Sequence, residues 1–235
     1  MTSSPLYWRD QQLMVWPTAV VASGPDGIVL DESAFYPGGG GQPADLGQLE
    51  WGGVFTRIAG VGAGGLQPVE GDPIPPPGTA VVARLDDVRR QQIMRTHSAL
   101  HVVCGVIWRD FGSLVTGSSM EALAGRLDFD LPAVPEGFKA DLERVVNEEI
   151  GRDRAIRTRV VSRAEASGDP DVMRTAAQLI PESVEQIRIV DVDGLDKQAD
   201  SGTHVASTKQ IGEVVVAKVE SKGRGFRRVR IVLPQ

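Results

Sequence analysis

The chain has 235 residues, 41% of them hydrophobic, and a net charge of −6. This length is enough for one large domain or two modest ones, and the apolar fraction suits a packed globule. No apolar run approaches the roughly 18 residues of a membrane helix, and the first residues lack the pattern of a secretion signal. We therefore expect a cytoplasmic protein with no membrane partner. The single cysteine, Cys104, excludes an internal disulfide, and its apolar neighbours predict a buried structural thiol.

The first third of the chain alternates apolar and polar residues between glycine turns. Short strands are expected at residues 13–21, 28–31, 49–51, 54–61 and 79–85. Such spacing is typical of a small β-barrel, and the proline-rich segment 72–78 is expected to be a stiff connector. The sequence predicts a β-barrel domain over residues 1–85.

The hydrophobic period then changes. From Asp86 or Asp87 to Asp110, apolar residues recur at helical spacing without a proline, and Gly112 marks the end of this long helix. A second helix is expected from about 136 to 150, and Ser162 to Glu165 is a capping box that opens a short third one. Segments typical of strands occupy residues 113–123, 126–131, 155–161, 185–192, 213–220 and 226–233. The fold class predicted for residues 86–235 is α+β.

All three histidines fall in two short motifs. His97 and His101 are four residues apart on the long helix, and His204 follows Asp200 by four. Residues four apart share one helix face, and neutral imidazoles most often bind zinc. A single buried histidine is usually a packed core residue, but two pairs favour a metal site. Ser98 follows His97, so this is not the metalloprotease motif in which a glutamate at that position is the general base.

Four consecutive glycines, 38 to 41, lie in the segment 35–47, which we call the glycine loop. Ordering such a run is entropically costly, so a rigid role requires a ligand or partner that only bare backbone can approach. A mobile linker is the alternative, but Phe35, Tyr36 and Pro37 stand where a linker would carry serine. No Lys-Ser or Lys-Thr follows the glycines, which argues against a nucleotide-phosphate loop.

The end of the chain is basic although the whole chain is acidic. The tail from Lys218 to Arg230 has one acidic residue, Glu220, and its basic residues are Lys218, Lys222, Arg224, Arg227, Arg228 and Arg230. A solvated edge strand and a phosphate-binding surface both explain such a run. A second basic stretch, between Arg152 and Arg163, modestly favours phosphate binding.

Taken together, several motifs resemble the AlaX family, the freestanding relatives of the editing domain of alanyl-tRNA synthetase. They are the glycine loop, His97-x-x-x-His101, Arg126-Leu127-Asp128-Phe129-Asp130, Gly202-Thr203-His204-Val205 and Gln210-Ile211-Gly212, in order over about residues 12 to 233. A glycine-rich barrel before the metal domain is similar to the medium-length form of that family. The resemblance implies that residues 86–235 form an editing domain with an antiparallel sheet and a long metal-binding helix.

The resemblance also implies an ester hydrolase that uses zinc to deacylate mischarged tRNA, typically alanine tRNA carrying serine or glycine. It carries over three metal ligands, His97, His101 and His204. The family's fourth ligand is a cysteine, and Asp200 stands at that position. A carboxylate is a harder ligand than a thiolate, so other divalent ions are compatible with the site. Asp200 could ligate the metal, orient an imidazole or act as a catalytic base, and we favour ligation.

Further site residues follow from the same resemblance. Thr203 and Ser118 are candidate catalytic hydroxyls near the amino acid, although such residues in loops are more often simple caps. The expected tRNA contacts are Gly39, Gly40, Gly41, Gln42, Lys222, Arg224, Arg227 and Arg228. Two other functions stay open, a metal-dependent hydrolase of a small ester or amide and a non-catalytic tRNA-binding protein with a structural metal.

Overall fold

The structure is a computed structural model that describes residues 5–169, 172, 180–181, 183–223 and 225–235. The chain divides into two compact units, Met1–Gln92 and Ile93–Gln235. This division lies inside the long helix, whereas the domains expected from the sequence meet just before it and stay a prediction. Among the described residues, none of the helices combines the length and the apolar character needed to cross a bilayer. The cytoplasmic location stays a prediction.

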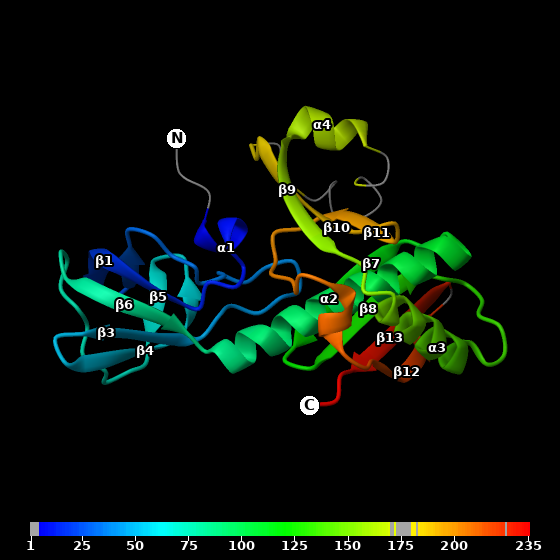
Figure 1. Cartoon of the computed structure of the whole chain (residues 1–235), viewed down its shortest axis with the longest axis horizontal. Coiled ribbons are helices and arrows are strands. Elements are labelled where there is room, and N and C mark those ends of the chain that lie inside the picture. The colour runs from blue at the N-terminus through cyan, green and yellow to red at the C-terminus, as the bar shows by residue number, and fades with distance from the viewer. Residues whose placement is uncertain (1–4, 170–171, 173–179, 182, 224) are drawn as a thin grey trace. The chain divides into compact units, whose positions relative to one another are not determined.

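The first unit is a closed antiparallel barrel with the strand order β1-β2-β5-β4-β3-β6 (Figure 1). Its elements are α1 (Leu6–Arg9), β1 (Val15–Gly24), β2 (Gly27–Leu30), β3 (Gly47–Trp51), β4 (Val54–Gly62), β5 (Gly65–Pro68) and β6 (Ala80–Leu85). Trp16 and Val20 of β1 belong to the buried apolar core, together with Leu49 of β3 and Ala83 of β6. The predicted barrel is therefore confirmed. Strand β5 was not expected, because its sequence, Gly-Leu-Gln-Pro, begins with glycine, ends with proline and contains a single apolar side chain suited to a strand.

The second unit is built around helix α2 (Asp87–Phe111), whose residues 96–107 are all buried. The unit contains two antiparallel sheets with the orders β11-β10-β9 and β12-β13-β8-β7. Their strands are β7 (Val115–Glu121), β8 (Ala124–Asp130), β9 (Ile156–Ser162), β10 (Gln186–Val192), β11 (Asp196–Ala199), β12 (Val215–Ser221) and β13 (Phe226–Val232). The predicted α+β class and long helix are confirmed, and the chain leaves the helix at Gly112, which has a φ of 62°.

Helix α2 contacts both sheets closely through two glycines. A Cβ added to Gly105 of α2 would lie 2.8 Å from the carbonyl oxygen of Leu195, in the turn between β10 and β11. A Cβ added to Gly125 of β8 would lie 3.1 Å from Leu100 of the helix. The small residues thus allow the backbones to approach. Because sheets lie against it, the helix is buried on every face over residues 96–107, including polar residues such as Thr96, His97, Ser98 and His101.

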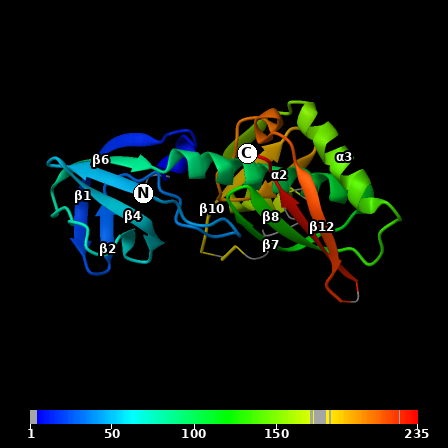
Figure 2. The ribbon, with the colours of Figure 1, turned by 90° about the horizontal axis from the view of Figure 1, so that it is seen from below.

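The remaining helices cover the sheets. Helix α3 (Phe138–Gly151) lies beside β12 in both views (Figure 1 and Figure 2), and Asn147 bonds to both the N–H and the carbonyl of Val214. Helix α4 (Arg163–Gly168) begins as the sequence predicts, because the Ser162 hydroxyl accepts the N–H of Glu165 at 3.2 Å. A 3-10 helix, Thr208–Ile211, follows the loop that contains His204.

Candidate metal centre

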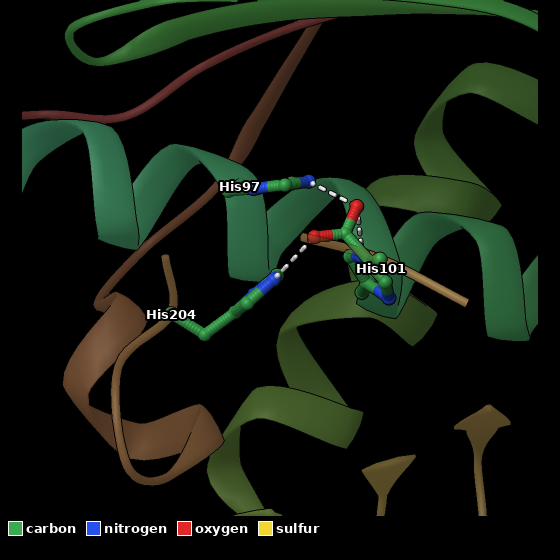
Figure 3. A group of neighbouring side chains, drawn as sticks. His97, His101 and His204 are labelled. Carbon is green, nitrogen blue, oxygen red and sulfur yellow. Dashed lines mark hydrogen bonds and ion pairs between the residues drawn. The ribbon is translucent and has the colours of Figure 1, made fainter. Parts of the chain in front are cut away.

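Three imidazoles and one carboxylate converge in the second unit (Figure 3). The ligand atoms of His97, His101, Asp200 and His204 all lie within 4.8 Å of one another. Oδ2 of Asp200 is 3.3 Å from Nε2 of His97 and 3.9 Å from Nε2 of His101. Its other oxygen, Oδ1, is 3.4 Å from Nε2 of His204. The structure thus brings together all four residues that the sequence pointed to as metal ligands.

Two elements supply these side chains. His97 and His101 lie one turn apart on helix α2, as their spacing predicts. Asp200 and His204 lie in the loop after β11. Arg188 of β10 holds this loop through hydrogen bonds to its backbone. The Arg188 guanidinium donates to the carbonyl oxygens of Asp200 at 3.0 Å and Gly202 at 2.8 Å. The loop therefore has a fixed shape although it contains no regular secondary structure.

The far nitrogens of two imidazoles are held by neighbouring polar groups. Nδ1 of His101 lies 2.8 Å from Oδ2 of Asp196, which also accepts a bond from the Gln198 amide at 2.8 Å. Nδ1 of His204 lies 3.2 Å from the hydroxyl of Ser98. Such contacts turn the Nε2 atoms toward the cluster, as the supporting groups of metal-bound histidines do.

Burial and charge set the protonation of the cluster. Burial alone would raise the pKa of Asp200, but His97, His101 and His204 outweigh it and hold that pKa well below the usual range. Burial, with the nearby His97, holds the pKa of His204 well below its usual range. Burial also lowers the pKa of His101, but its bonds to Asp196 and Asp200 prevail and raise it to about 9. The cluster thus contains an ionised carboxylate beside an imidazole, His204, that favours its neutral form.

This donor set fits a divalent cation. Ligand atoms on a tetrahedral zinc ion are separated by roughly 3.3 to 3.5 Å. Oδ2 of Asp200 is 3.3 Å from Nε2 of His97 and Oδ1 is 3.4 Å from Nε2 of His204, both within that range, whereas the 3.9 Å from Oδ2 to Nε2 of His101 is longer. Three imidazole nitrogens and one carboxylate oxygen are also a ligand set that zinc accepts.

The other predicted residues of this unit are placed as follows. Thr203 is fully buried in the loop between Asp200 and His204, and Ser118 is half-buried on β7. Cys104 is buried, as its apolar surroundings predict. Residues Asp196, Ser98, Gln198 and Arg188 were missed by the sequence analysis. Ser98 is the neighbour of His97 in the sequence. The sequence around Asp196 and Arg188 gives no sign of a role in the site, because their partners come from other elements.

The basic tail forms β13 and the end of β12, and much of its charge is neutralised. Arg228 makes two bonds to Asp128, at 2.7 and 2.8 Å, and Lys222 lies 3.3 Å from the same carboxylate. The Arg228 bond is the main reason why the pKa of Asp128 falls to about 2. Arg227 donates to the carbonyl of Pro132 at 3.1 Å. Arg224 lies outside the described residues.

The glycine loop belongs to the first unit and is a hydrogen-bonded hairpin rather than an open linker. Gly39 and Gln42 exchange both backbone bonds, at 3.0 and 2.9 Å. Gly40 and Gly41 between them have φ values of 57° and 90°, as a type I′ turn requires. Gly39 and Gly40 are exposed, whereas Gln42 is buried.

Comparisons with known proteins identify the family of the chain. Residues 187–230, which include Asp200 and His204, match the family model of the threonyl and alanyl tRNA synthetase second additional domain. Alanyl-tRNA editing protein AlaX-M of Saccharolobus solfataricus is 33% identical over 95% of this chain and 96% of its own length. AlaX-M of Methanosarcina acetivorans is 32% identical over 88% of each chain. The alanine–tRNA ligase of Korarchaeum cryptofilum is 34% identical over 95% of this chain, but over 25% of the ligase. The chain therefore belongs to the AlaX family of alanyl-tRNA editing proteins.

Proposed function

We propose that the protein is a zinc-dependent aminoacyl-tRNA deacylase that hydrolyses the ester of alanine tRNA mischarged with serine or glycine. The observation that carries this proposal is the convergence of three buried histidines, His97, His101 and His204, with the half-buried Asp200 in a chain of the alanyl-tRNA editing family. An ester hydrolase needs a group that stabilises negative charge on the carbonyl oxygen in the transition state. A divalent ion, when bound, supplies that positive charge and polarises the ester carbonyl.

The three histidines and Asp200 are the proposed metal ligands. Asp200 fits ligation better than a separate role as base, because its two oxygens already face Nε2 atoms of the histidines. A base on the reacting water would instead need a free oxygen directed at the substrate. The carboxylate also makes manganese or another hard divalent ion a possible alternative to zinc.

Two hydroxyls are proposed to complete the site, with different roles. The partial exposure of Ser118 favours direct contact with the amino acid. Complete burial of Thr203 favours a role in shaping the loop that carries Asp200 and His204.

The tRNA itself is proposed to bind the tip of the glycine loop, where Gly39 and Gly40 are exposed, and the basic tail. The tip residues are Gly39, Gly40, Gly41 and Gln42, and the tail residues are Lys222, Arg224, Arg227 and Arg228. Bare glycine backbone lets a nucleic-acid chain approach its N–H groups, and the tail cations suit phosphates. The net charge of −6 means that such attraction is confined to local patches.

The test is deacylation of a panel of mischarged tRNAs, with metal content measured on the same sample. We expect release of serine or glycine from alanine tRNA by the wild type, loss of activity after chelation, and recovery when zinc is restored. The double variant His97→Ala, His101→Ala should lose both metal and activity. Deacylation that survives the double substitution would rule out the mechanism. Turnover of small esters without tRNA would favour the small-ester hydrolase, and tRNA binding without any turnover would favour the non-catalytic protein.

A further inference from the structure

Among the described residues, the bulkiest side chain that is fully buried belongs to a charged residue, Arg90, near the start of α2. Its partner is Asp45, which is also buried and lies in the returning limb of the glycine loop. Nε of Arg90 lies 3.0 Å from Oδ1 of Asp45, and Nη2 pairs with Oδ2 of the same carboxylate. Neither residue is used by the proposed chemistry, and both lie in the first unit.

The guanidinium joins the two limbs of the glycine loop at its base. Besides Asp45, it donates through Nη2 to the carbonyl of Ala34, the residue just before the loop, at 2.6 Å. Asp45 in turn accepts the N–H of Tyr36 at 2.7 Å and donates its own N–H to the Tyr36 carbonyl at 3.0 Å. The neighbouring Arg89 donates to the carbonyl of Ala44 at 2.9 Å. Consecutive residues of one helix therefore fix both the outgoing and the returning limb.

This network extends from the base toward the tip. The Tyr36 ring packs edge-on against Tyr7, with ring centres 5.4 Å apart, and its hydroxyl donates to the carbonyl of Gly39 at 3.0 Å. Gly39 begins the two-residue turn that ends at Gln42. The entropic cost of ordering four glycines is thus offset by bonds anchored on the buried pair.

Stability alone does not explain a charged pair at this place. Removing two charges from water is costly, and well-packed apolar residues of similar volume often stabilise a protein as much or more. The pair instead sets the orientation of the two loop limbs, because a guanidinium holds its N–H donors in one rigid plane, in the shape of a fork. Two of its donors meet Asp45 and one of these also meets Ala34, so the fork determines how the limbs are placed.

We propose that Arg90 and Asp45 are positioning residues that hold the glycine loop in the shape in which its tip binds the tRNA substrate. This inference rests on the proposed function, since it assigns the tip a tRNA contact. The pair includes no proposed metal ligand and no proposed catalytic hydroxyl. Its effect is on substrate binding rather than on the chemical step.

The experiment compares Arg90→Lys and Asp45→Asn with the wild type in the full chain loaded with zinc. Lysine keeps the charge but loses the fork, and asparagine keeps the shape but loses the charge. Arg109→Lys is the matched control, because Arg109 also donates to a buried carboxylate, Glu149 at 2.6 Å, but in the second unit. Three quantities are measured, namely hydrogen exchange of peptides from residues 35–45, the Kd for alanine tRNA, and the KM and kcat of deacylation.

For both test variants we expect loop amides to exchange at least about tenfold faster, and Kd and KM to rise about tenfold. The kcat should stay within about twofold of the wild type, and the metal content should be unchanged. Arg109→Lys should match the wild type in all loop and tRNA measurements. Unchanged loop exchange, or unchanged tRNA affinity despite faster exchange, in a folded Asp45→Asn protein would overturn the proposal even if Arg90→Lys fails to fold. A wild type that binds tRNA but deacylates none would overturn the proposed function, whereas weaker binding by the variants would still support the positioning role.

Discussion

Oδ2 of Asp196 lies 2.8 Å from Nδ1 of His101, on the side of the imidazole that faces away from the other candidate metal ligands. The contact links the short strand β11 to helix α2, and it directs Nε2 of His101 toward Asp200. Loss of the negative charge of Asp196 should make the His101 imidazole a weaker metal ligand but leave it in the site. We predict that Asp196→Asn lowers zinc affinity by about 10- to 100-fold, measured by competition with a chelating dye.

The matched control for that variant is Asp193→Asn. Asp193 is in the preceding turn and is exposed, with Arg157 as a distant partner at 3.9 Å. Its substitution should leave zinc affinity unchanged. Equal affinities for Asp196→Asn and the wild type would show that Asp196 does not orient His101.

Asp200 occupies the position at which the AlaX resemblance places a cysteine ligand. We predict that Asp200→Ala lowers zinc affinity by at least about tenfold, because the cluster loses one of four donors. We also predict that Asp200→Cys retains zinc but loses affinity for manganese, because a thiolate is a softer ligand. Both affinities are measured by titration calorimetry. Full metal occupancy and wild-type affinity in Asp200→Ala would exclude direct ligation.

Glu149 is a buried carboxylate at the end of α3 that pairs with Arg109 at 2.6 Å and with Arg154 at 2.8 Å. Burial alone would raise its pKa, but Arg154 and Arg109 outweigh it and leave the pKa below the usual 4.5. A lowered pKa in the folded state stabilises the protein above pH 4.5, and this contribution is lost as the pH falls through the folded-state value. Glu149→Gln should therefore lower the free energy of unfolding at pH 7, by about 2 kcal/mol for the lost bonds to charged groups.

That cost should shrink as the pH is lowered below the usual pKa of Glu149, since the wild type then loses the same charge. Urea unfolding at a series of pH values measures the difference. Glu148→Gln is the control, because Glu148 is exposed and pairs along the helix surface with Arg144, four residues before it. If the free energies of unfolding of Glu149→Gln and the wild type differed by the same amount at every pH, the lowered pKa of Glu149 would be contradicted.

Lys222 is exposed just after β12 and has a partner, Asp128, at 3.3 Å. If it contacts a tRNA phosphate, Lys222→Ala should weaken binding and reduce the slope of log Kd against log salt by about one. Filter binding at several salt concentrations measures this slope. Lys139→Ala, which removes an exposed lysine from α3, should leave both quantities unchanged. The same slope for both variants would remove Lys222 from the proposed tRNA surface.

Much of the local structure followed from the sequence because the forces that determine it act over a few residues. The proline-free apolar period of α2 placed His97 and His101 on one face, and the hydroxyl of Ser162 marked the start of α4. Strand β11 could not be recognised in this way. Its four residues, Asp-Lys-Gln-Ala, contain no alternating apolar pattern, and they form a strand because β10 offers them a hydrogen-bonding edge.

By itself the sequence determined which residue types could bind a metal and that two of them share a helix turn. The family resemblance added Asp200 and His204 to that set, and the structure places them beside the two helix histidines. Only the tertiary structure decided that Asp196 supports His101 and that Arg90 holds the base of the glycine loop. These contacts join residues 45 to more than 90 positions apart. The spacing of residues along the chain does not predict such pairs. They form because packing of the elements buries charged groups, and a buried charge without a partner is costly.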